Sequence, residues 1–392
     1  MHSCTFTRTS QLKRRRQKCR TLLRSRRDFC LSYPIPSYLL IFMIKITDPP
    51  NSPDLALVAD RARIDRVSSL GILDRLPPEI MSIVLGMLDI QSVVRFARVS
   101  SPGNSCVQSH RAYRDLATFA PQVLSALGRV GLIGLHSVAD LHAVLRTERC
   151  AACVEFGAFL FLPTGERCCW ECLRYNPSFR MLLPNKAMRV FGLSQRHLER
   201  LPTLHVIPGG YGISADPAPE NCRLVSVQAA KALGLEVHGS ASKLTQAMAR
   251  RCRSARLSVE GRFLQSEPVV ASQGQDLLLL PSQGNLSNDE YFGMASIPFP
   301  SLSKSGRIED GLWCRGCALT LRRYHLLPRD VLAAVVPANV EPQRVMIGLE
   351  RRARSKEAFL NHVKSCYGAR LLAPDIPTGN RWHWPIAVRR GD

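Results

Sequence analysis

Apolar residues recur at every third or fourth position between residues 79 and 88, which places them on one face of a helix. Pro77 and Pro78 precede this segment and suit a first helical turn, where a missing N–H group leaves no hydrogen bond unmade. A second periodic segment runs over 93–99, and we predict a break at 102–104, where Pro, Gly and Asn follow one another. The pattern therefore predicts a helical hairpin. The apolar positions of its first helix are Ile80, Ile83, Val84, Met87 and Leu88.

The same periodicity predicts further helices on both sides of two cysteine-rich segments. The helices are expected at 110–119, 121–132, 137–147, 179–200 and 226–256, and the cysteine-rich segments lie at 150–172 and 313–366. We predict a Pro- and Gly-rich loop at 202–222 and a short buried strand at 277–280. The expected fold class is mainly α, with small α+β modules around the cysteines.

Composition agrees with a folded protein: of 392 residues, 45% are hydrophobic and 21% are charged. The formal net charge is +22, and many of the basic residues lie within residues 1–30. An apolar segment comes next at 38–44, an order that imitates a signal peptide, but the basic stretch is too long and Pro34 and Pro36 interrupt the apolar part. We predict a disordered basic arm, or a sequence upstream of a start at Met43.

No other apolar run approaches the roughly 20 residues that a membrane helix needs. We therefore expect a soluble protein of the nucleus or cytoplasm, with no membrane partner. In a reducing compartment, paired cysteines are more typical of metal sites than of disulfides.

The first cysteine-rich segment contains two Cys-x-x-Cys pairs, which is the spacing of a four-thiolate zinc site. The competing interpretations are buried or disulfide-bonded cysteines. Cys168 competes with Cys169, but only Cys169 gives the second pair its spacing, and the apolar residues between the pairs predict a hairpin core. The expected ligands are Cys150, Cys153, Cys169 and Cys172.

The second segment pairs Cys314 and Cys317 with a later His-x-x-x-Cys, His362 and Cys366. A spacing of four places imidazole and thiolate side by side on one helix face, so we expect a second structural zinc ion with a Cys-Cys-His-Cys shell. His325 competes with His362 as the third ligand.

The sequence contains no phosphate-binding Gly-rich loop with lysine, no nucleophile elbow and no His-Glu-x-x-His helix. Four protein ligands would also leave each zinc ion without an open position for a catalytic water. We therefore expect a protein that is not an enzyme.

The hairpin resembles an F-box. The order Leu76-Pro77-x-Glu79, an apolar helix ending in leucine, and a second helix closing in valine and a small polar residue is shared with that family. The resemblance implies a non-catalytic subunit that binds the Skp-type adaptor of a cullin-based ubiquitin ligase. Because the family's usual basic residue and Trp are replaced by Pro102 and its neighbours, a third helix is expected to be displaced or different. The implied adaptor-binding residues are Leu76, Pro77, Ile80, Val84, Leu88, Val94 and Val99.

Both cysteine segments add to a resemblance with fungal F-box proteins, which combine Cys-x-x-Cys, an aromatic segment, Leu-Pro-Thr and Cys-aromatic-Glu-Cys-Leu, and later Trp-Cys-x-Gly-Cys with His-x-x-x-Cys. The similarity spans residues 70–200 and 310–370. It predicts an N-terminal extension (1–46), a linker (47–69), an F-box (70–116), a helical connector (117–148), a first zinc module (149–176), a variable region (177–300), a second zinc module (301–372) and a tail (373–392).

The expected function is that of an F-box substrate receptor, which recruits an unidentified protein for ubiquitination. The alternative is a zinc-stabilised nucleic-acid-binding regulator, which the positive charge and the basic segment at 250–256 would favour. Basic runs are more often solvated faces, so we do not expect nucleic acid as the partner.

Overall fold

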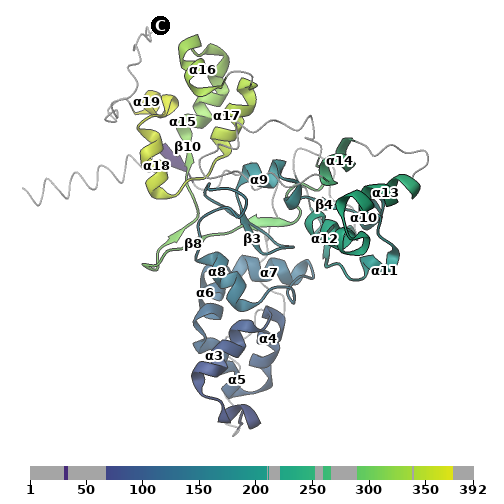
Figure 1. The fold of residues 1–392 in the computed structure, drawn as a ribbon. Coiled ribbons are helices and arrows are strands. Elements are labelled where there is room, and N and C mark those ends of the chain that lie inside the picture. The colour runs from purple at the N-terminus through teal and green to yellow at the C-terminus, as the bar shows by residue number, and fades with distance from the viewer. Residues whose placement is uncertain are drawn as a thin grey trace, which may run out of the picture. The chain divides into compact units, whose positions relative to one another are not determined.

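The computed structural model describes residues 31–33, 68–209, 211, 221–251, 259–265, 289–337 and 340–373 (Figure 1). The chain divides into two compact units. The larger unit comprises residues 37–310, and the smaller unit joins residues 1–36 to residues 311–392. Helices predominate in both and the sheets are small, which confirms the predicted fold class at this level.

The larger unit begins with a succession of short helices (Figure 1). They are η1 (Gly71–Arg75), α3 (Pro78–Met87), α4 (Ile90–Val99), α5 (Ser101–Ser109), α6 (Arg111–Phe119), α7 (Pro121–Arg129) and α8 (Val138–Leu145). At the start of α4 the Asp89 carboxylate accepts a hydrogen bond from the Ser92 amide at 2.9 Å. At the start of α8 the Ser137 hydroxyl accepts one from the Asp140 amide at 3.0 Å. These caps satisfy first-turn amides and fix where each helix begins.

The chain breaks after α4 at Ser100, but residues 102–104 lie in the next helix and not in the predicted break. The Ser100 hydroxyl accepts a hydrogen bond from the Gly103 amide at 3.1 Å and so caps α5. Pro102 falls in the first turn, where proline is tolerated. α5 therefore follows the hairpin directly, and only the predicted break at 102–104 is wrong.

The first cysteine-rich segment contributes two strands to a three-stranded sheet of order β3-β2-β7. β2 (Phe159–Phe161) pairs antiparallel with β3 (Glu166–Cys168), as the predicted hairpin requires, and on its other edge with β7 (Ser296–Pro298). α9 (Trp170–Tyr175) follows β3, and β8 (Ser301–Leu302) pairs with β9 (Ile308–Glu309) in a separate sheet. β7 therefore brings a distant part of the sequence to the hairpin.

A second three-stranded sheet has the order β4-β6-β5, formed by Met181–Leu182, Arg223–Ser226 and Thr203–His205. The elements around it are η2 (Pro177–Phe179), α10 (Pro184–Phe191), α11 (Gln195–Leu198), α12 (Val227–His238), α13 (Ala241–Arg251) and α14 (Val259–Gln265). The helices expected in 179–200 and 226–256 are present in shorter form. β4 and β5 were predicted as helix and loop, because strands of two or three residues carry too little alternation to be recognised.

The smaller unit is a group of helices around a two-stranded sheet. β1 (Ser32–Tyr33) pairs antiparallel with β10 (Trp313–Cys314). The remaining elements are α15 (Arg315–Arg323), η4 (Tyr324–Leu326), α16 (Arg329–Val335), α17 (Pro342–Arg351), α18 (Lys356–Val363) and α19 (Tyr367–Leu372). Residues 31–33 thus belong to a folded unit, whereas the sequence predicted a disordered extension over 1–46.

Several predicted features lie outside the described residues: the basic residues up to position 30, the apolar segment 38–44, the linker prolines, the strand at 277–280, and Arg253 and Arg256 of the basic segment. Among the residues that the structure describes, no helix has the length and hydropathy needed to cross a membrane.

Candidate metal centres

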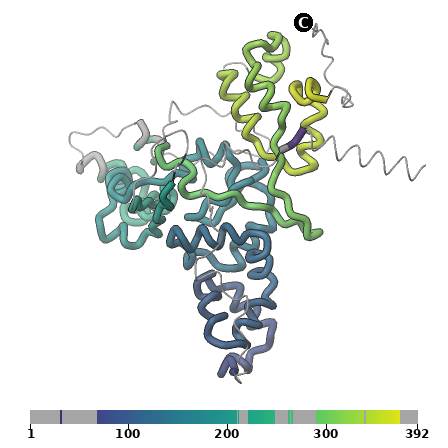
Figure 2. Tube along the Cα trace, turned by 180° about the vertical axis from the view of Figure 1, so that it is seen from behind, coloured from purple at the N-terminus to yellow at the C-terminus, as the bar shows by residue number. Residues whose placement is uncertain are grey.

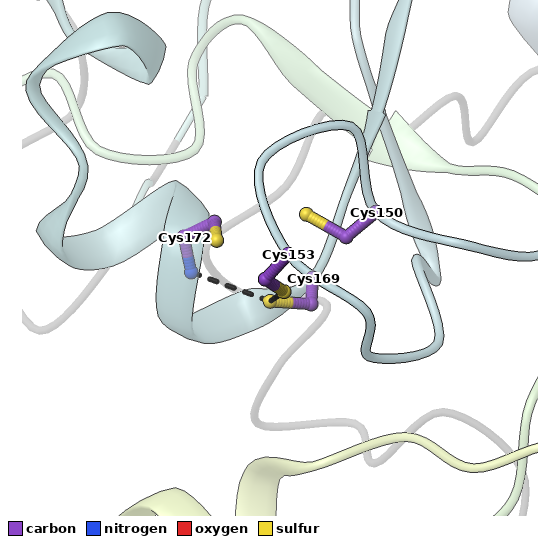
Figure 3. A group of neighbouring side chains, drawn as sticks. All are labelled: Cys150, Cys153, Cys169 and Cys172. Carbon is purple, nitrogen blue, oxygen red and sulfur yellow. Dashed lines mark hydrogen bonds between the residues drawn. The ribbon is translucent and has the colours of Figure 1, made fainter. Parts of the chain in front are cut away.

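The first candidate centre joins a turn to the beginning of a short helix. Cys150 and Cys153 lie on the turn after α8, and Cys169 and Cys172 lie at the start of α9. The four side chains point toward one another (Figure 3). Cys169 is the N-cap of α9, and its sulfur accepts a hydrogen bond from the Cys172 amide at 3.4 Å. All four cysteines are buried.

The spacing of the sulfurs fits a tetrahedral ion. The four Sγ atoms lie within 4.8 Å of one another, and those of Cys153 and Cys169 are 3.6 Å apart. Four sulfurs held about 2.3 Å from a tetrahedral zinc ion lie about 3.8 Å from one another. A disulfide needs about 2.05 Å, and all four cysteines are free thiols. The first cluster could therefore hold a metal ion, as the spacing in the sequence predicted.

The charges of this donor set also favour a cation. Hydrogen bonds from Cys153, Cys169 and Cys172 lower the pKa of the Cys150 thiol, because they stabilise its thiolate. The bonds to Cys150 raise the pKa of Cys169 and of Cys172, since each proton is held between two sulfurs. Thiolates this close repel one another, so few of the four thiols can be ionised at once unless a cation balances the negative charge.

Backbone hydrogen bonds fix the turn that carries Cys150. The Cys150 amide donates to the Glu155 carbonyl at 2.9 Å, and the Ala151 amide donates to the Arg167 carbonyl at 2.8 Å. The turn is thereby tied to β3. Cys168 is the last residue of β3 and lies outside the cluster, so Cys169 is the ligand candidate, as predicted. Burial raises the pKa of the Cys168 thiol well above its usual value, which keeps it protonated.

Arg167 supports this arrangement from the interior, with only 2% of its surface exposed. Its guanidinium donates hydrogen bonds to the carbonyls of Gly157 at 2.6 Å, Phe299 at 2.8 Å, Val144 and Pro300. It also lies over the Phe299 ring, 4.6 Å from the centroid. Burial lowers its pKa to about 10, so it is still a cation at neutral pH. No pattern in the sequence indicates this role, because the four acceptors are backbone atoms from distant segments.

The second candidate centre has the same plan in the smaller unit. Cys314 ends β10 and is the N-cap of α15, and Cys317 lies in the first turn of that helix. His362 lies in the last turn of α18, whereas Cys366 is the N-cap of α19. His362 and Cys366 therefore do not share one helix, but the Cys366 amide still donates to the His362 carbonyl at 3.0 Å, which keeps the two side by side.

Distances in the second cluster also fit a tetrahedral ion. The Cys366 sulfur lies 3.8 Å from that of Cys314 and 3.9 Å from that of Cys317, and the Cys317 sulfur is 3.2 Å from Nε2 of His362. His325 is not in this group; it is exposed in η4 and its ring packs against Tyr324. The choice of His362 over His325 is thus the one that the geometry supports.

The pKa values of the cysteines in the second cluster are shifted for the same reason as those in the first cluster. Hydrogen bonds from Cys317 and Cys366 lower the pKa of Cys314, and the bonds to Cys314 raise the pKa of Cys317 and raise that of Cys366 to about 12. Burial lowers the pKa of His362. The imidazole is therefore held neutral, which is the form that binds a metal ion.

Two glycines allow the helices of the second cluster to touch. A Cβ atom on Gly316 would overlap the backbone of Ala369, and one on Gly368 would overlap the carbonyl oxygen of Gly316. The backbones of α15 and α19 approach so closely that only glycine fits at either position. The glycine in Cys314-Arg-Gly-Cys317 therefore positions Cys366, which precedes α19.

Each cluster supplies four ligands from two separate segments of the chain. A tetrahedral ion bound there would have no open position for water or substrate. The arrangement is suited to a structural role, in which the metal ties the two segments together.

The predicted adaptor-binding residues have mixed exposure. Leu76, Pro77, Ile80, Val84 and Val99 are exposed, Leu88 is half-buried and Val94 is buried. Two further apolar residues of α3, which are not among the implied adaptor-binding residues, are exposed as well: Ile83 at 59% and Met87 at 74%. We call the exposed apolar residues of η1 and α3, together with Leu76 between these helices, the apolar face. Its members are Ile72, Leu73, Leu76, Ile80, Ile83, Val84 and Met87.

Comparison of the chain with protein families, curated proteins and solved structures found no match.

Proposed function

We propose that the chain is a non-catalytic F-box substrate receptor, which binds a Skp-type adaptor through the apolar face and brings a target protein to a cullin-based ubiquitin ligase. The observation that carries this proposal is the exposure of the apolar face. Leu76, Ile80, Ile83 and Met87 follow one another at spacings of three and four, so they line one side of the chain entering and forming α3. Exposed apolar surfaces of this kind mark protein interfaces.

The buried side of the same hairpin supports this interpretation. Met81 and Leu85 of α3 and Ile90 and Val93 of α4 are buried, so the two helices already have a core. The residues of the apolar face are outside that buried set and keep between 37% and 83% of their surface exposed. Covering one isoleucine completely contributes about 1.5 to 3 kcal/mol. Several such residues on one face would supply the affinity of a stable complex.

We propose further that both clusters hold zinc. Thiolate and imidazole are ligands that zinc prefers, and four of them in a tetrahedral arrangement are typical of structural zinc. Metal binding would then contribute to folding, because the unfolded chain has no preformed site. In this function the metal-tied region holds the target, and ubiquitin transfer is promoted by proximity alone.

The test is co-purification of the full chain with a Skp-type adaptor and a cullin, using an Ile83→Asp variant. A carboxylate placed in an apolar interface is unpaired and costly, so we expect adaptor affinity to fall at least tenfold. Ile83 is exposed, so the free protein should keep its fold. Leu326→Asp is the matched control, because Leu326 is 70% exposed and lies outside the apolar face.

Zinc content and hydrogen exchange would verify that both variants are folded. Adaptor retained by Ile83→Asp at the level of the unaltered chain, or no adaptor retained by the unaltered chain, would refute the F-box proposal. A Leu76→Ala/Pro77→Ala double variant tests the start of the same face with a milder change.

A further inference from the structure

The segment Leu31–Tyr33 lies along the second metal cluster, although the whole larger unit separates it from β10 in the sequence. Ser32 pairs with Cys314 and Tyr33 with Trp313, in an antiparallel register. The short strand β1 is the purple segment beside β10 in Figures 1 and 2. One of its two partners on β10 is therefore a candidate metal ligand.

Leu31 is the residue that fixes this segment. It is 3% exposed and packs in a buried cluster that includes three of the candidate ligands. The members of that cluster are Leu31, Cys314, Cys317, Phe359, Val363, Cys366 and Ala369. An apolar side chain packed in the same cluster as the sulfurs limits the access of water and small reagents to the centre.

The position of β10 is fixed by contacts of its own residue Trp313. Trp313 is completely buried, and its indole N–H donates to the Arg351 carbonyl at 3.1 Å, which fixes β10 against α17. Among the described residues, β1 is the strand that pairs with β10. Proteins bind extended peptides at fixed strand edges, where backbone pairing gives affinity and burial of an alternate side chain gives specificity; here the buried side chain is that of Leu31.

We propose that the edge of β10 is a strand-docking site, and that the chain fills it with its own residues Leu31–Tyr33, which close over the second metal centre. The ligand class is a short extended peptide with a leucine just before the pairing residues. The leucine side chain packs in the buried cluster that contains Cys314, Cys317 and residues of α18, and the two following residues pair with β10. This inference does not depend on the F-box proposal.

The first experiment compares the full chain with Leu31→Asp and with Leu326→Asp as the matched control. The reactivity of the smaller unit's cysteines toward a maleimide is followed by mass spectrometry, and release of metal to a chelator is followed in parallel. We expect Cys314, Cys317 and Cys366 to react at least tenfold faster in Leu31→Asp, with the first cluster unchanged as the internal reference. Equal rates in the two variants would overturn the proposal. The maleimide reaction decides this even for a preparation that carries no metal.

The second experiment uses a labelled peptide of residues 29–36 with Cys30→Ser, which avoids unwanted thiol reactions. We expect the Leu31→Asp chain to bind this peptide, and the unaltered chain to bind it at least tenfold more weakly because its own segment occupies the site. A peptide carrying Leu31→Asp serves as the control. Equal binding of the two peptides, or no binding to the Leu31→Asp chain, would overturn the docking site. An unaltered chain that is a dimer, and a monomer after Leu31→Asp, would assign the segment to a second copy and overturn docking within one chain.

Discussion

Replacing Arg167 by methionine tests whether the first candidate centre depends on a buried cation. The change keeps much of the volume of the side chain and removes the donors that hold four backbone carbonyls, those of Val144, Gly157, Phe299 and Pro300. These carbonyls come from the end of α8, from the residues before β2 and from the residues after β7. Arg167 therefore joins three parts of the chain that the sequence does not join.

The magnitude follows from the contacts. A hydrogen bond to a charged donor contributes about 1.5 to 3 kcal/mol, and a cation over an aromatic ring about 0.5 to 2 kcal/mol. Desolvation of the guanidinium, which also lowers its pKa to about 10, offsets part of that sum. We therefore expect the free energy of local opening to fall by about 3 to 5 kcal/mol, because the change leaves up to four carbonyl oxygens without their donor.

Hydrogen exchange of the β2 amides, read by mass spectrometry, is the suitable assay because it reports local opening and does not require the whole chain to unfold in one step. A loss of 3 kcal/mol corresponds to exchange that is faster by about a hundredfold or more. Arg111→Met is the matched control: its side chain is 72% exposed and pairs with Asp115 at 3.8 Å, so it should change exchange little. A change below about 1 kcal/mol in Arg167→Met would refute the reasoning.

Three further outcomes are expected. Cys153→Ser should lose one equivalent of zinc by elemental analysis, whereas Cys168→Ser should keep both, because only Cys153 lies in a cluster; equal zinc contents would refute the ligand assignment. Burial lowers the pKa of His136, whose ring N–H donates to the Leu162 carbonyl at 2.6 Å. Below about pH 6.5 the unfolded chain therefore binds more protons than the folded chain. The protection of the β2 amides should fall as the pH is lowered from about 6.5 through the pKa of folded His136, and it should fall less in His136→Asn. Identical pH profiles of the two proteins would refute this prediction. Gly316→Ala should expose the second cluster to maleimide, because the new methyl group meets backbone, and a wild-type labelling rate would contradict that packing.

The candidate ligands could be predicted from the sequence because each pair is local. Cys-x-x-Cys and His-x-x-x-Cys bring two ligands together within one turn of chain, whatever the rest of the fold does. The structure brings these pairs together in two clusters that could hold a metal ion, with Cys169 and His362 in them and Cys168 and His325 outside. The helices could be predicted for the same reason, since the apolar period is a local property.

Contacts between distant segments could not be predicted in this way. β7 joins the first hairpin and β1 joins β10, and each contributes two or three residues to its sheet. Strands this short show no alternation, and their partners are chosen by tertiary packing. The helix start at Ser100 was missed for a different reason. Proline and glycine suggested a break, while the serine cap and the tolerance of a first turn for proline decide the local structure.

The two centres share a local arrangement of ligands at the start of a helix. In each, a cysteine at the end of a strand or directly after it caps a helix, and the second cysteine of the pair lies in the first turn: Cys169 and Cys172 in α9, Cys314 and Cys317 in α15. The remaining ligands then come from a segment that must be brought to that helix. In the first centre the β2–β3 hairpin, which contains Arg167, brings that segment to the helix over a short stretch of sequence. In the second, the close approach of α15 and α19 at their glycines does so, and the strand from residues 32–33 closes the remaining edge.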